Sequence, residues 1–406
     1  MNPERRRVLV IDDDPLVGKM TLAHLKAGGH QGRATQDVEE FMKMCGDWRP
    51  DVVIVDLVMG DVDGLEVLQM LADRDYPAGV IIASGQEGRI LDAARRFADA
   101  SGLDYLGTLP KPYRRNQLLD LLDYSPPPFN HDVARRTPTT SDEASRRNLA
   151  WADGEFEESF RDGLTSGAVS VVFQPKVGCS SREVVGYEAL ARWRHPERGA
   201  IEPSEFVPLA ERKGLVSSLT DLVMRKSLDW FGSHRQREGK HLSVNVSAAE
   251  FSDPDLDGRL LRSCQEAGVK AESVTVELTE TSAMEDPVLS LQLLTRLRLR
   301  GFQVSLDDFG TGYSSMLQLA RLPFSELKVD QSFVGSARES GESLIVVRSI
   351  IDLGHALGLT CTAEGVEHED VLSILNKYGC DYAQGHHIGH PMEPEALESW
   401  LETAKA

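Results

Sequence analysis

Acidic and amide side chains stand at the ends of the strand-like segments in the second half of the chain. In order along the sequence, these residues and one lysine among them are Gln174, Glu188, Asn245, Glu277, Asp307-Asp308, Lys328, Glu364 and Gln384. If the strands form one barrel, these ends meet at its mouth, and the gathered carboxylates would repel one another strongly. Bound divalent cations would remove that repulsion. Oxygen ligands without histidine or cysteine favour Mg2+ or Mn2+ over zinc.

The predicted ligands are numerous enough for two cations. Two ions about 3.5–4 Å apart activate water and stabilise the leaving oxygen of a phosphodiester. The alternative is that these acids are polar only because strand ends are exposed to solvent. For any single acid, this explanation is as good as a functional one. The histidines near the C-terminus are not expected to add ligands, because His386 and His387 are adjacent and cannot share one face of a helix or strand.

A smaller set of the same kind stands in the first part of the chain. Strand-like segments there end in Asp12-Asp13, Asp56, Ser84 and Lys111. Three carboxylates at one sheet edge suit Mg2+, and a hydroxyl and an ammonium beside them could hold a phosphoryl group attached to one carboxylate. Each acid could instead cap the helix that follows it. Four matching strand ends are harder to explain in that way.

Short runs of Val and Ile alternate with helical patterns over the first 124 residues. Val8–Ile11, Val52–Val55 and Val80–Ala83 are continuously apolar, which is typical of parallel strands covered on both faces. Pro15 begins a helix between the first two, and a weaker strand at Arg33–Thr35 is predicted mainly from the spacing. The pattern predicts an α/β fold with a doubly wound (flavodoxin-like) five-stranded parallel sheet.

The alternation resumes over about 250 residues after position 152, the usual size of one α/β barrel. The turn Gly178–Glu183 between the first two strands is too short for a crossover and permits only an antiparallel hairpin. We therefore expect a modified TIM (β/α)8 barrel with one antiparallel strand. Its predicted strands are Val169–Val177, Val184–Leu190, Leu242–Val246, Val274–Leu278, Gln303–Leu306, Glu326–Val329, Thr360–Ala363 and Tyr382–Gln384.

Composition places the domain boundaries. Ser125–Pro128 is a proline run, and the stretch from there to Asn148 has hardly an apolar residue. Such a segment cannot build a core and is typical of a solvated linker. The predicted domains are therefore residues 5–124 and 152–406, joined by a polar linker at 125–151.

Charge and cysteine content limit the partners. The 406 residues contain 44 Lys and Arg against 64 Asp and Glu, a net charge of −20, and such a field repels DNA. The apolar stretches are too short to span a membrane, and the first is ended by acids too early for a signal peptide. Five scattered cysteines without a CxxC pair fit a reducing compartment. We expect no DNA binding, no membrane span and a cytoplasmic location.

The first domain resembles the receiver domain of two-component response regulators. The resemblance rests on VLVIDDDP, VVIVDLVMGDVDGLEVL, IIASG and LPKPY. It implies that Asp56 is the phosphoacceptor and that Asp12 and Asp13 hold one Mg2+ or Mn2+ ion beside it. Ser84 would be the switch hydroxyl and Lys111 the lysine that binds the phosphoryl group.

The receiver resemblance has two departures. Gly60 stands where a proline is usual. The switch aromatic usually lies three residues before the lysine, where this chain has Thr108, and Tyr105 lies earlier. We expect a longer loop before the lysine, and a cis bond between Lys111 and Pro112.

The second domain resembles the EAL domain, which hydrolyses cyclic di-GMP to linear pGpG. The resemblance covers roughly Phe156 to Met392 and rests on FQPKV, GYEALARW, LSVNVS, VELTE, SLDDFGTGYSS, LKVDQSFV, TAEGVE and AQGHHIGHPM. It implies two Mg2+ or Mn2+ ions, with Asp307 shared between them. The implied metal ligands are Glu188, Asn245, Glu277, Asp307 and Asp308, and the implied catalytic residues are Glu188, Lys328, Glu364 and Asp308.

The EAL resemblance also assigns substrate contacts and a loop. Gln174, Arg192 and Gln384 would contact the substrate, Arg192 as a fork on a phosphate. His386 and Ile388 stand where aromatic residues are common. The segment Asp308–Ser315 resembles a loop that anchors the metal ligands and transmits the state of the dimer. The implied residues of this regulatory loop are Glu280, Phe309, Gly310 and Gly312.

Three functions follow from these resemblances. The first is a response regulator whose cyclic di-GMP phosphodiesterase activity is modulated by phosphorylation of Asp56. Its partners would be cyclic di-GMP, a cognate sensor histidine kinase and further copies of the chain in a homodimer or higher oligomer. The second is a catalytically weak or inactive EAL domain that binds cyclic di-GMP as an effector, and the third is a scaffold. Inactive EAL domains usually lack metal ligands, and every such ligand is present here, which favours the enzyme.

Overall fold

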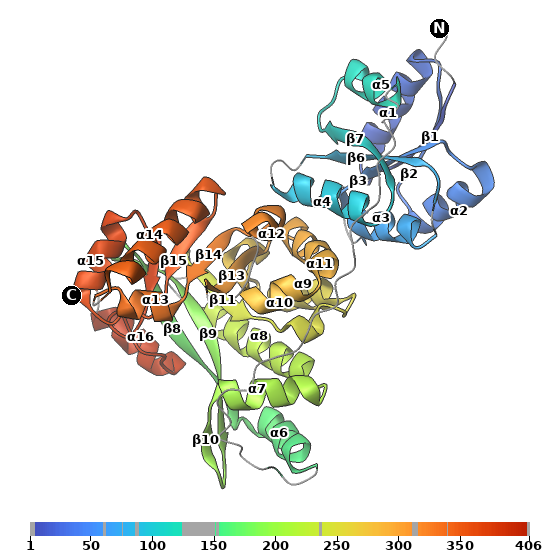
Figure 1. The fold of residues 1–406 in the computed structure, drawn as a ribbon. Coiled ribbons are helices and arrows are strands. Elements are labelled where there is room, and N and C mark those ends of the chain that lie inside the picture. The colour runs from blue at the N-terminus through green and yellow to red at the C-terminus, as the bar shows by residue number, and fades with distance from the viewer. Residues whose placement is uncertain are drawn as a thin grey trace. The chain divides into compact units, whose positions relative to one another are not determined.

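The computed structural model describes residues 5–59, 62–74, 76–85, 89–123, 151, 154–234, 238–310, 316–338 and 340–403. Gly60, Gly312 and the predicted linker up to residue 150 lie outside the described residues. The chain forms two compact units, one built on a five-stranded sheet and one on a nine-stranded sheet (Figure 1). Each unit is considered by itself.

The first unit has a parallel sheet with the strand order β2-β1-β3-β6-β7. Every pairing in it is parallel, which confirms the predicted doubly wound fold. The strands are β1 (Arg7–Ile11), β2 (Gln31–Thr35), β3 (Val52–Asp56), β6 (Gly79–Ser84) and β7 (Asp104–Pro110). The elements between and after them are α1 (Pro15–Ala27), α2 (Val38–Trp48), β4 (Val58–Met59), β5 (Val62–Asp63), α3 (Gly64–Ala72), α4 (Arg89–Ala100) and α5 (Arg115–Asp123).

Local signals explain where these elements begin. β3 and β6 are buried along their whole length, as expected for apolar strands with helices on both faces. Helix α1 has Pro15 in its first turn, and the Asp14 side chain accepts a hydrogen bond of 2.8 Å from the Leu16 N–H. The Asp37 side chain caps α2 in the same way, accepting from the Glu40 N–H at 2.7 Å.

The structure corrects one prediction in β7. The residues before Lys111 form a strand rather than the longer loop that was predicted. The additional residue is taken up inside the strand, because the pairing with β6 shifts register between Val80 and Ile81. Tyr105 lies opposite Val80 and Gly107 opposite Ile81, so Leu106 is the residue that bulges.

Eight strands close the barrel of the second unit, in the order β8-β9-β11-β12-β13-β14-β15-β16. Strand β8 is antiparallel to β9 and to β16, and the other neighbours in the ring are parallel. The predicted modified TIM barrel with one antiparallel strand is thus confirmed. A short ninth strand, β10, pairs antiparallel with β9 outside the ring, and the sequence did not predict it.

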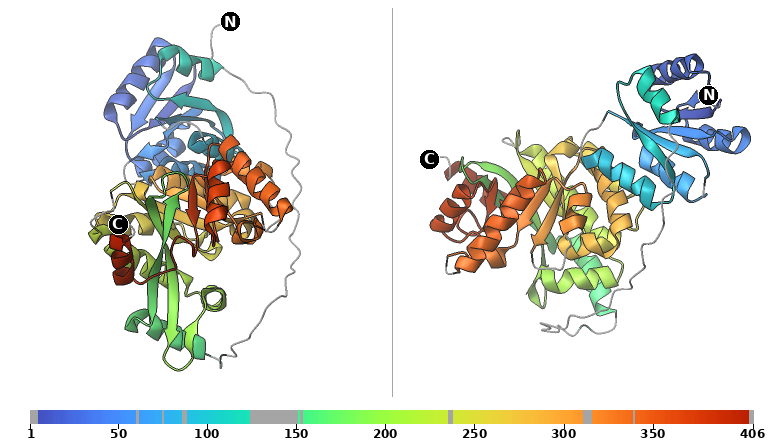
Figure 2. Two further views of the ribbon diagram at one scale, coloured as in Figure 1. Left: turned by 90° about the vertical axis from the view of Figure 1, so that its left-hand side faces the viewer. Right: turned by 45° about the horizontal axis from the view of Figure 1, so that its top comes forward.

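The bounds of the barrel strands agree with the predicted ones to within a few residues. The long hairpin of β8 and β9 is visible in Figures 1 and 2. The nine strands are β8 (Val169–Gly178), β9 (Val184–His195), β10 (Gly199–Ile201), β11 (His241–Asn245), β12 (Val274–Thr279), β13 (Gln303–Phe309), β14 (Glu326–Val329), β15 (Thr360–Ala363) and β16 (Tyr382–Gln384).

Helices surround the barrel strands. Pro287 and the Asp286 cap begin a helix that runs to Leu299. The α-helices of this unit are α6 (Glu155–Ser166), α7 (Pro203–Arg212), α8 (Val216–Ser233), α9 (Leu256–Glu266), α10 (Glu280–Glu285), α11 (Pro287–Leu299), α12 (Met316–Arg321), α13 (Gln331–Ser336), α14 (Gly341–Ala356), α15 (Glu369–Lys377) and α16 (Pro394–Thr403). Short 3-10 turns lie at Ala248–Glu250 and Ala271–Ser273.

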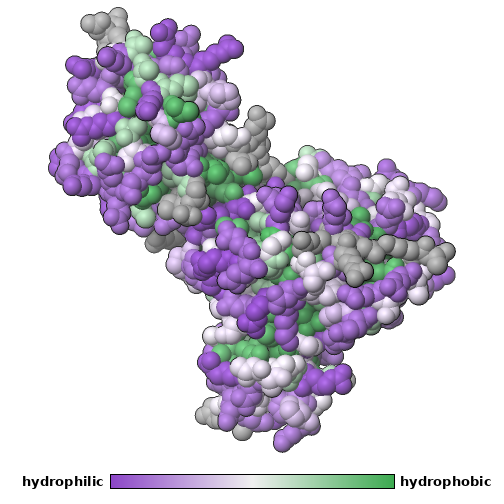
Figure 3. Space-filling model, turned by 180° about the vertical axis from the view of Figure 1, so that it is seen from behind, coloured by the Kyte–Doolittle hydropathy of each residue, from purple (hydrophilic) through white to green (hydrophobic). Residues whose placement is uncertain are grey.

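The surface is described by its hydropathy. The face shown in Figure 3 is largely hydrophilic, with apolar residues showing in smaller areas. Within the described residues, no helix has the length and apolar character needed to cross a membrane. All five cysteines are free and buried.

Candidate active site

The carboxyl ends of the barrel strands bring the predicted catalytic residues together around the ammonium group of Lys328. Its Nζ lies 2.6 Å from Glu364 Oε1, 2.7 Å from Glu277 Oε2, 3.1 Å from Asp307 Oδ2 and 3.4 Å from Glu188 Oε2. These residues come from β14, β12, β13, β9 and the position directly after β15. The convergence follows from the topology, because parallel barrel strands all end at the same mouth.

Burial and charge set the protonation of this cluster. The Lys328 and Glu277 side chains are each 1% exposed. Burial disfavours the charge of Lys328, but the surrounding carboxylates raise its pKa well above its usual value. Burial raises the pKa of Glu277 to about 8 and that of Glu364 well above its usual range, although Lys328 opposes both shifts. Without further cations, one ammonium cannot keep all of these acids ionised.

Glu188 is the acid that its neighbours keep ionised. Burial works against its charge, but Lys328 and hydrogen bonds from two amides lower its pKa. Gln384 Nε2 donates to Glu188 Oε2 at 2.6 Å, and Asn245 Nδ2 donates to Glu188 Oε1 at 2.9 Å. The Asn245 carbonyl oxygen therefore remains available as a ligand. Gln384 Nε2 also donates to Gln174 Oε1 at 3.1 Å, which links both predicted substrate-binding glutamines to the cluster.

Asp308 lies in a strained backbone conformation beside two other acids. Its φ of 55° is in the left-handed region, which residues other than glycine seldom adopt. Burial, followed by the charges of Asp307 and Asp330, raises the pKa of Asp308 to about 6. The Asp308 N–H donates to Asp307 Oδ1 at 2.9 Å. The conformation therefore places two consecutive carboxylates at one mouth, at a cost in repulsion.

The donor set fits divalent cations. Carboxylate oxygens of Glu188, Glu277 and Asp307 lie within 4.8 Å of one another, as do those of Asp307, Asp308 and Glu364. Among the described residues, Glu277 Oε1 is buried without a hydrogen-bond partner. The donors are hard oxygen atoms. The total negative charge of the carboxylates exceeds the single positive charge of Lys328. Mg2+ or Mn2+ suits such a set, and Asp307 belongs to both groups.

A cavity of about 160 Å³ opens at the mouth of the barrel beside the cluster. The predicted substrate contacts Gln174 and Gln384 line it, together with predicted catalytic residues. Five further lining residues were missed by the sequence reasoning: Leu190, Gln331, Gly365, Glu367 and Gly385. Leu190 could have been found, since it stands two positions after Glu188 on a strand and therefore faces the same side. The complete lining is Gln174, Glu188, Leu190, Gln331, Glu364, Gly365, Glu367, Gln384, Gly385 and His386.

Arg192 lies further along β9, and its guanidinium group contacts the neighbouring backbone. It is half-buried on β9 opposite Ser170, and its Nη1 donates to the Ala191 carbonyl at 2.8 Å. His386 lines the cavity, and its ring packs on that of His390 with 4.1 Å between centroids. Ile388 follows in the turn after β16. The position that commonly carries an aromatic ring is therefore filled by a pair of imidazoles.

The described part of the predicted regulatory loop is tied to a buried acid. Glu280, 3% exposed at the start of α10, accepts a hydrogen bond of 2.9 Å from the Gly310 N–H. Gly310 has φ of 106°, and a Cβ there would lie 2.9 Å from the Phe333 ring, so glycine is required for both reasons. Phe309 is buried, and Gly312 lies outside the described residues.

The first unit gathers its own set at the sheet edge. Lys111 Nζ lies 2.6 Å from Asp12 Oδ2 and 2.7 Å from Asp56 Oδ2. Carboxylate oxygens of Asp12, Asp13 and Asp56 lie within 4.8 Å of one another. Burial raises the pKa of Asp56, against the effect of Lys111. Buried Ser84 ends the neighbouring strand β6, so these five side chains lie at one edge, as expected.

The structure around Lys111 agrees in part with the predictions from the sequence. The bond between Lys111 and Pro112 is cis, as expected. Thr108, at the usual position of the switch aromatic, shares a hydrogen bond between hydroxyl groups with Tyr105. The bulge in β7 explains this contact, because it brings residues three positions apart to the same side of the strand.

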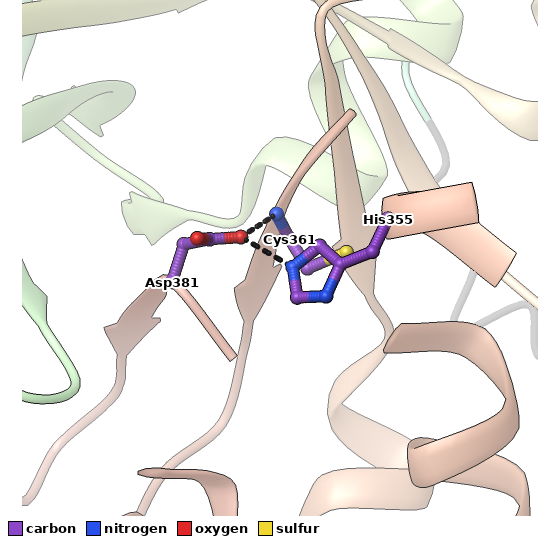
Figure 4. Close-up of side chains that lie close together, drawn as sticks. All are labelled: His355, Cys361 and Asp381. Carbon is purple, nitrogen blue, oxygen red and sulfur yellow. Dashed lines mark hydrogen bonds and ion pairs between the residues drawn. The ribbon is translucent and has the colours of Figure 1, made fainter. Parts of the chain in front are cut away.

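A third group of possible ligands lies at the amino end of β15, opposite the mouth that holds the Lys328 cluster. Asp381 Oδ2 is 2.9 Å from His355 Nε2 and accepts from the Cys361 N–H at 2.8 Å (Figure 4). Burial raises the pKa of the Cys361 thiol to about 12, and its Sγ donates to the Ile351 carbonyl at 3.6 Å. A protonated thiol is a poor metal ligand. We interpret this group as a structural tie between α14, β15 and the segment before β16.

Both parts of the chain match known families. The model of the EAL domain matches residues 157–391, and that of the response regulator receiver domain matches residues 8–123. The cyclic di-GMP phosphodiesterase RocR of Pseudomonas aeruginosa is 31% identical over 395 residues, which are 95% of this chain and 96% of RocR. The uncharacterized protein y4lL of Sinorhizobium fredii is 36% identical over 60% of this chain, but the match spans only 29% of that longer relative.

Solved structures resemble the barrel unit. The phosphodiesterase MucR from P. aeruginosa, in complex with c-di-GMP, has a TM-score of 0.57 and 35% identity, and the match covers 60% of this chain and 99% of that one. The EAL domain of FimX from P. aeruginosa, bound to c-di-GMP, has a TM-score of 0.53 and 25% identity over 59% of this chain and 97% of that one.

Proposed function

The chain belongs to the EAL domain family and carries a receiver domain of the response regulators, and on that premise we propose that it hydrolyses cyclic di-GMP to linear pGpG. The observation that carries the proposal is the ring of four carboxylates around Lys328 at the barrel mouth. An EAL domain that only binds the nucleotide would not need this costly arrangement of buried charge.

The proposed cation ligands are residues of the cluster already described. Glu188, Asn245, Glu277 and Asp307 would hold one Mg2+ or Mn2+ ion, and Asp307 and Asp308 a second. Such ions supply Lewis acidity, neutralise the phosphodiester charge and make water a better nucleophile. The residues of the chain then have to orient the water and bind the substrate.

Lys328 and Glu364 are the proposed catalytic pair. Lys328 Nζ has more than one neighbour among the acids, and Glu364 Oε1 is 2.6 Å away. An ammonium donates in at most three hydrogen bonds, so Lys328 would exchange one of its carboxylate contacts for a hydrogen bond to the attacking water. When the proposed cations are bound, Glu364 is ionised. It then accepts a hydrogen bond from the same water and orients it.

The substrate would enter the cavity lined by the two glutamines. Gln384 Oε1 is buried without a partner among the described residues and is free to accept from a guanine amino or imino group. Arg192 would leave the Ala191 carbonyl and pair with a phosphate, because a charged acceptor is stronger than a neutral one. The two imidazoles of His386 and His390 would replace the usual aromatic ring.

The receiver would regulate the barrel through phosphorylation. Asp56 is the proposed acceptor, with a sensor histidine kinase as donor, one divalent cation held by Asp12, Asp13 and Asp56, and Lys111 on the phosphoryl group. The loop that begins at Asp308 and is anchored by Glu280 is the proposed receiving element, in a homodimer or higher oligomer. Phosphorylation can shift such a loop only by stabilising one of its arrangements more than the other. A cytoplasmic location remains a prediction.

A single assay tests the proposed activity. The purified 406-residue chain is incubated with cyclic di-GMP and Mg2+, and the products are separated by chromatography before and after chelation with EDTA. We expect linear pGpG with Mg2+ and none with EDTA. Tight binding of cyclic di-GMP without any product would instead identify the chain as an effector.

Regulation is tested on the same protein. The phosphodiesterase rate is compared with and without acetyl phosphate, in the natural chain and in Asp56→Asn. We expect a higher rate after phosphorylation in the natural chain only. Equal responses of the two proteins would show that the receiver does not act through Asp56.

A further inference from the structure

A second buried ion pair lies inside the barrel beneath the catalytic cluster. Lys176 Nζ is 2.8 Å from Glu326 Oε1, and the two side chains are 3% and 7% exposed. The Thr362 hydroxyl also donates to Glu326 Oε1. TIM barrel interiors are usually filled by branched apolar side chains, so a charged pair at this depth needs an explanation.

The pair stands one step below the catalytic residues on the same strands. Lys176 follows Gln174 by two positions on β8, and Glu326 precedes Lys328 by two positions on β14. Residues two apart on a strand face the same side. The interior thus holds two ammonium groups in successive layers, Lys328 with the upper carboxylates and Lys176 with Glu326.

The charges of the two layers act on one another. Lys176 is attracted to Glu277 of the upper layer and repelled by Lys328. Glu326 is attracted to Lys328 as well as to Lys176. If the observed pairing were lost, these attractions would draw Lys328 toward Glu326 and Lys176 toward Glu277. The observed pairing leaves Lys328 entirely to the catalytic carboxylates.

We infer that Lys176 is a positioning residue that, by pairing with Glu326, keeps Lys328 directed at the catalytic carboxylates. The inference rests on the proposed function, since it assigns Lys328 to the reaction. An unpaired Glu326 would be a buried carboxylate attracted to Lys328, and buried charges are strongly driven to find a partner.

Lys176 and Glu326 act on the reaction only through Lys328. They line a separate cavity of about 280 Å³ with His241, Gln303 and Tyr382 at the amino end of the barrel strands. Its described lining shares no residue with that of the catalytic cavity. A change in the pair therefore leaves the substrate contacts in place, which makes kcat and cation binding the informative readouts.

The two single variants should shift cation affinity in opposite directions. In Lys176→Met, Lys328 is drawn toward Glu326, the upper carboxylates lose positive charge, and Ca2+ should bind at least threefold tighter. In Glu326→Gln, Lys176 is released toward Glu277, positive charge is added, and Ca2+ should bind at least threefold weaker. The double variant Lys176→Met/Glu326→Gln has neither charge and should return to within twofold of the natural protein.

The experiment is a calorimetric titration of the four full-length proteins with Ca2+ in the absence of nucleotide. All four share the same receiver site, so its heat cancels in the comparison. Steady-state hydrolysis of cyclic di-GMP with Mg2+ is measured in parallel. We expect kcat to fall at least tenfold in Lys176→Met with KM within twofold, and to recover in the double variant.

A merely structural role would give a different pattern. Loss of packing would weaken Ca2+ binding in both single variants and would be worst in the double variant, and that result would overturn the inference. If Lys176→Met fails to fold, Glu326→Gln and the double variant are compared with each other. The inference predicts that the double variant regains the Ca2+ affinity that Glu326→Gln loses, because it lacks both charges of the pair. If the natural protein binds Ca2+ but hydrolyses no cyclic di-GMP, the proposed function fails while the titration still tests the positioning.

Discussion

The substitution Asp308→Asn should stabilise the protein in the absence of metal. Asp308 is held beside Asp307 and Asp330 with a pKa raised to about 6. Asparagine removes the charge, keeps the size of the side chain and tolerates the left-handed conformation that φ of 55° requires. We therefore expect a repulsive charge to be lost without backbone strain.

The magnitude follows from the shift in pKa. An aspartate loses its proton near pH 3.9 when unfolded, so a folded pKa of about 6 is a rise of about two units, or about 3 kcal/mol. Asp308 is partly exposed, and solvent screening reduces the figure to about 1–2 kcal/mol. The folded state holds the proton more tightly, so the free energy of unfolding of the natural protein should fall as the pH rises from about 4 through 6.

The assay is urea unfolding in EDTA, followed by tryptophan fluorescence at pH 5 and pH 8. At pH 8 the variant should be more stable than the natural protein by about 1–2 kcal/mol, and at pH 5 the difference should be clearly smaller. Asp162→Asn, at an exposed position of α6, is the control and should change neither value. Millimolar Mg2+ should reverse the order at pH 8, because the natural protein gains a ligand that the variant lacks.

A variant less stable than the natural protein at pH 8 in EDTA would refute the reasoning. It would mean that the Asp308 carboxylate stabilises the metal-free fold, and that the acids at this mouth serve to stabilise the protein. A gain that is equal at both pH values would also refute it, because the effect would then not come from the proton.

Three further outcomes are expected. Asp307→Asn should abolish hydrolysis of cyclic di-GMP with the circular dichroism spectrum unchanged, since Asp307 belongs to both groups of ligands; activity near the natural level would contradict two cations sharing it. Arg192→Ala should weaken nucleotide binding, measured with Ca2+ in place of Mg2+, by about 1.5–3 kcal/mol, as for a charge-assisted hydrogen bond; unchanged affinity would remove Arg192 from the site. Acetyl phosphate with Mg2+ should add one acid-labile phosphoryl group, detected by mass spectrometry, and Asp56→Asn should prevent it; a phosphoryl group on that variant would place the acceptor elsewhere.

Some features of the fold could be predicted because they depend on local pattern. Continuous Val and Ile in Val52–Val55 predicted a strand covered on both faces, and the structure has a strand buried along its whole length there. The short turn after Gly178 permitted only a hairpin, and β8 is antiparallel to β9 and to β16. The length of a turn and the pattern of apolar residues are properties of a few consecutive residues. They can therefore be read from the sequence without knowing which strands pair.

Features that depend on register could not be predicted. The number of residues before Lys111 suggested a loop, but a bulge at Leu106 absorbs the additional residue within β7. The strand β10 was missed because Gly199–Ile201 is short and forms only by pairing with a neighbour. A bulge or a short edge strand is decided by hydrogen bonds to another strand, which the local sequence does not contain.

The sequence by itself determined which residues stand at the strand ends and which face they share, because a strand alternates with a period of two. Glu188, Glu277, Asp307, Lys328 and Glu364 could therefore be placed at one mouth before any coordinates were known. Only the tertiary structure decided which charges pair. The 2.8 Å contact between Lys176 and Glu326, which leaves Lys328 to the acids at the mouth, depends on the closure of the barrel across β8 and β14. Pairing is a matter of a few ångströms between distant strands, and the sequence contains no such distance.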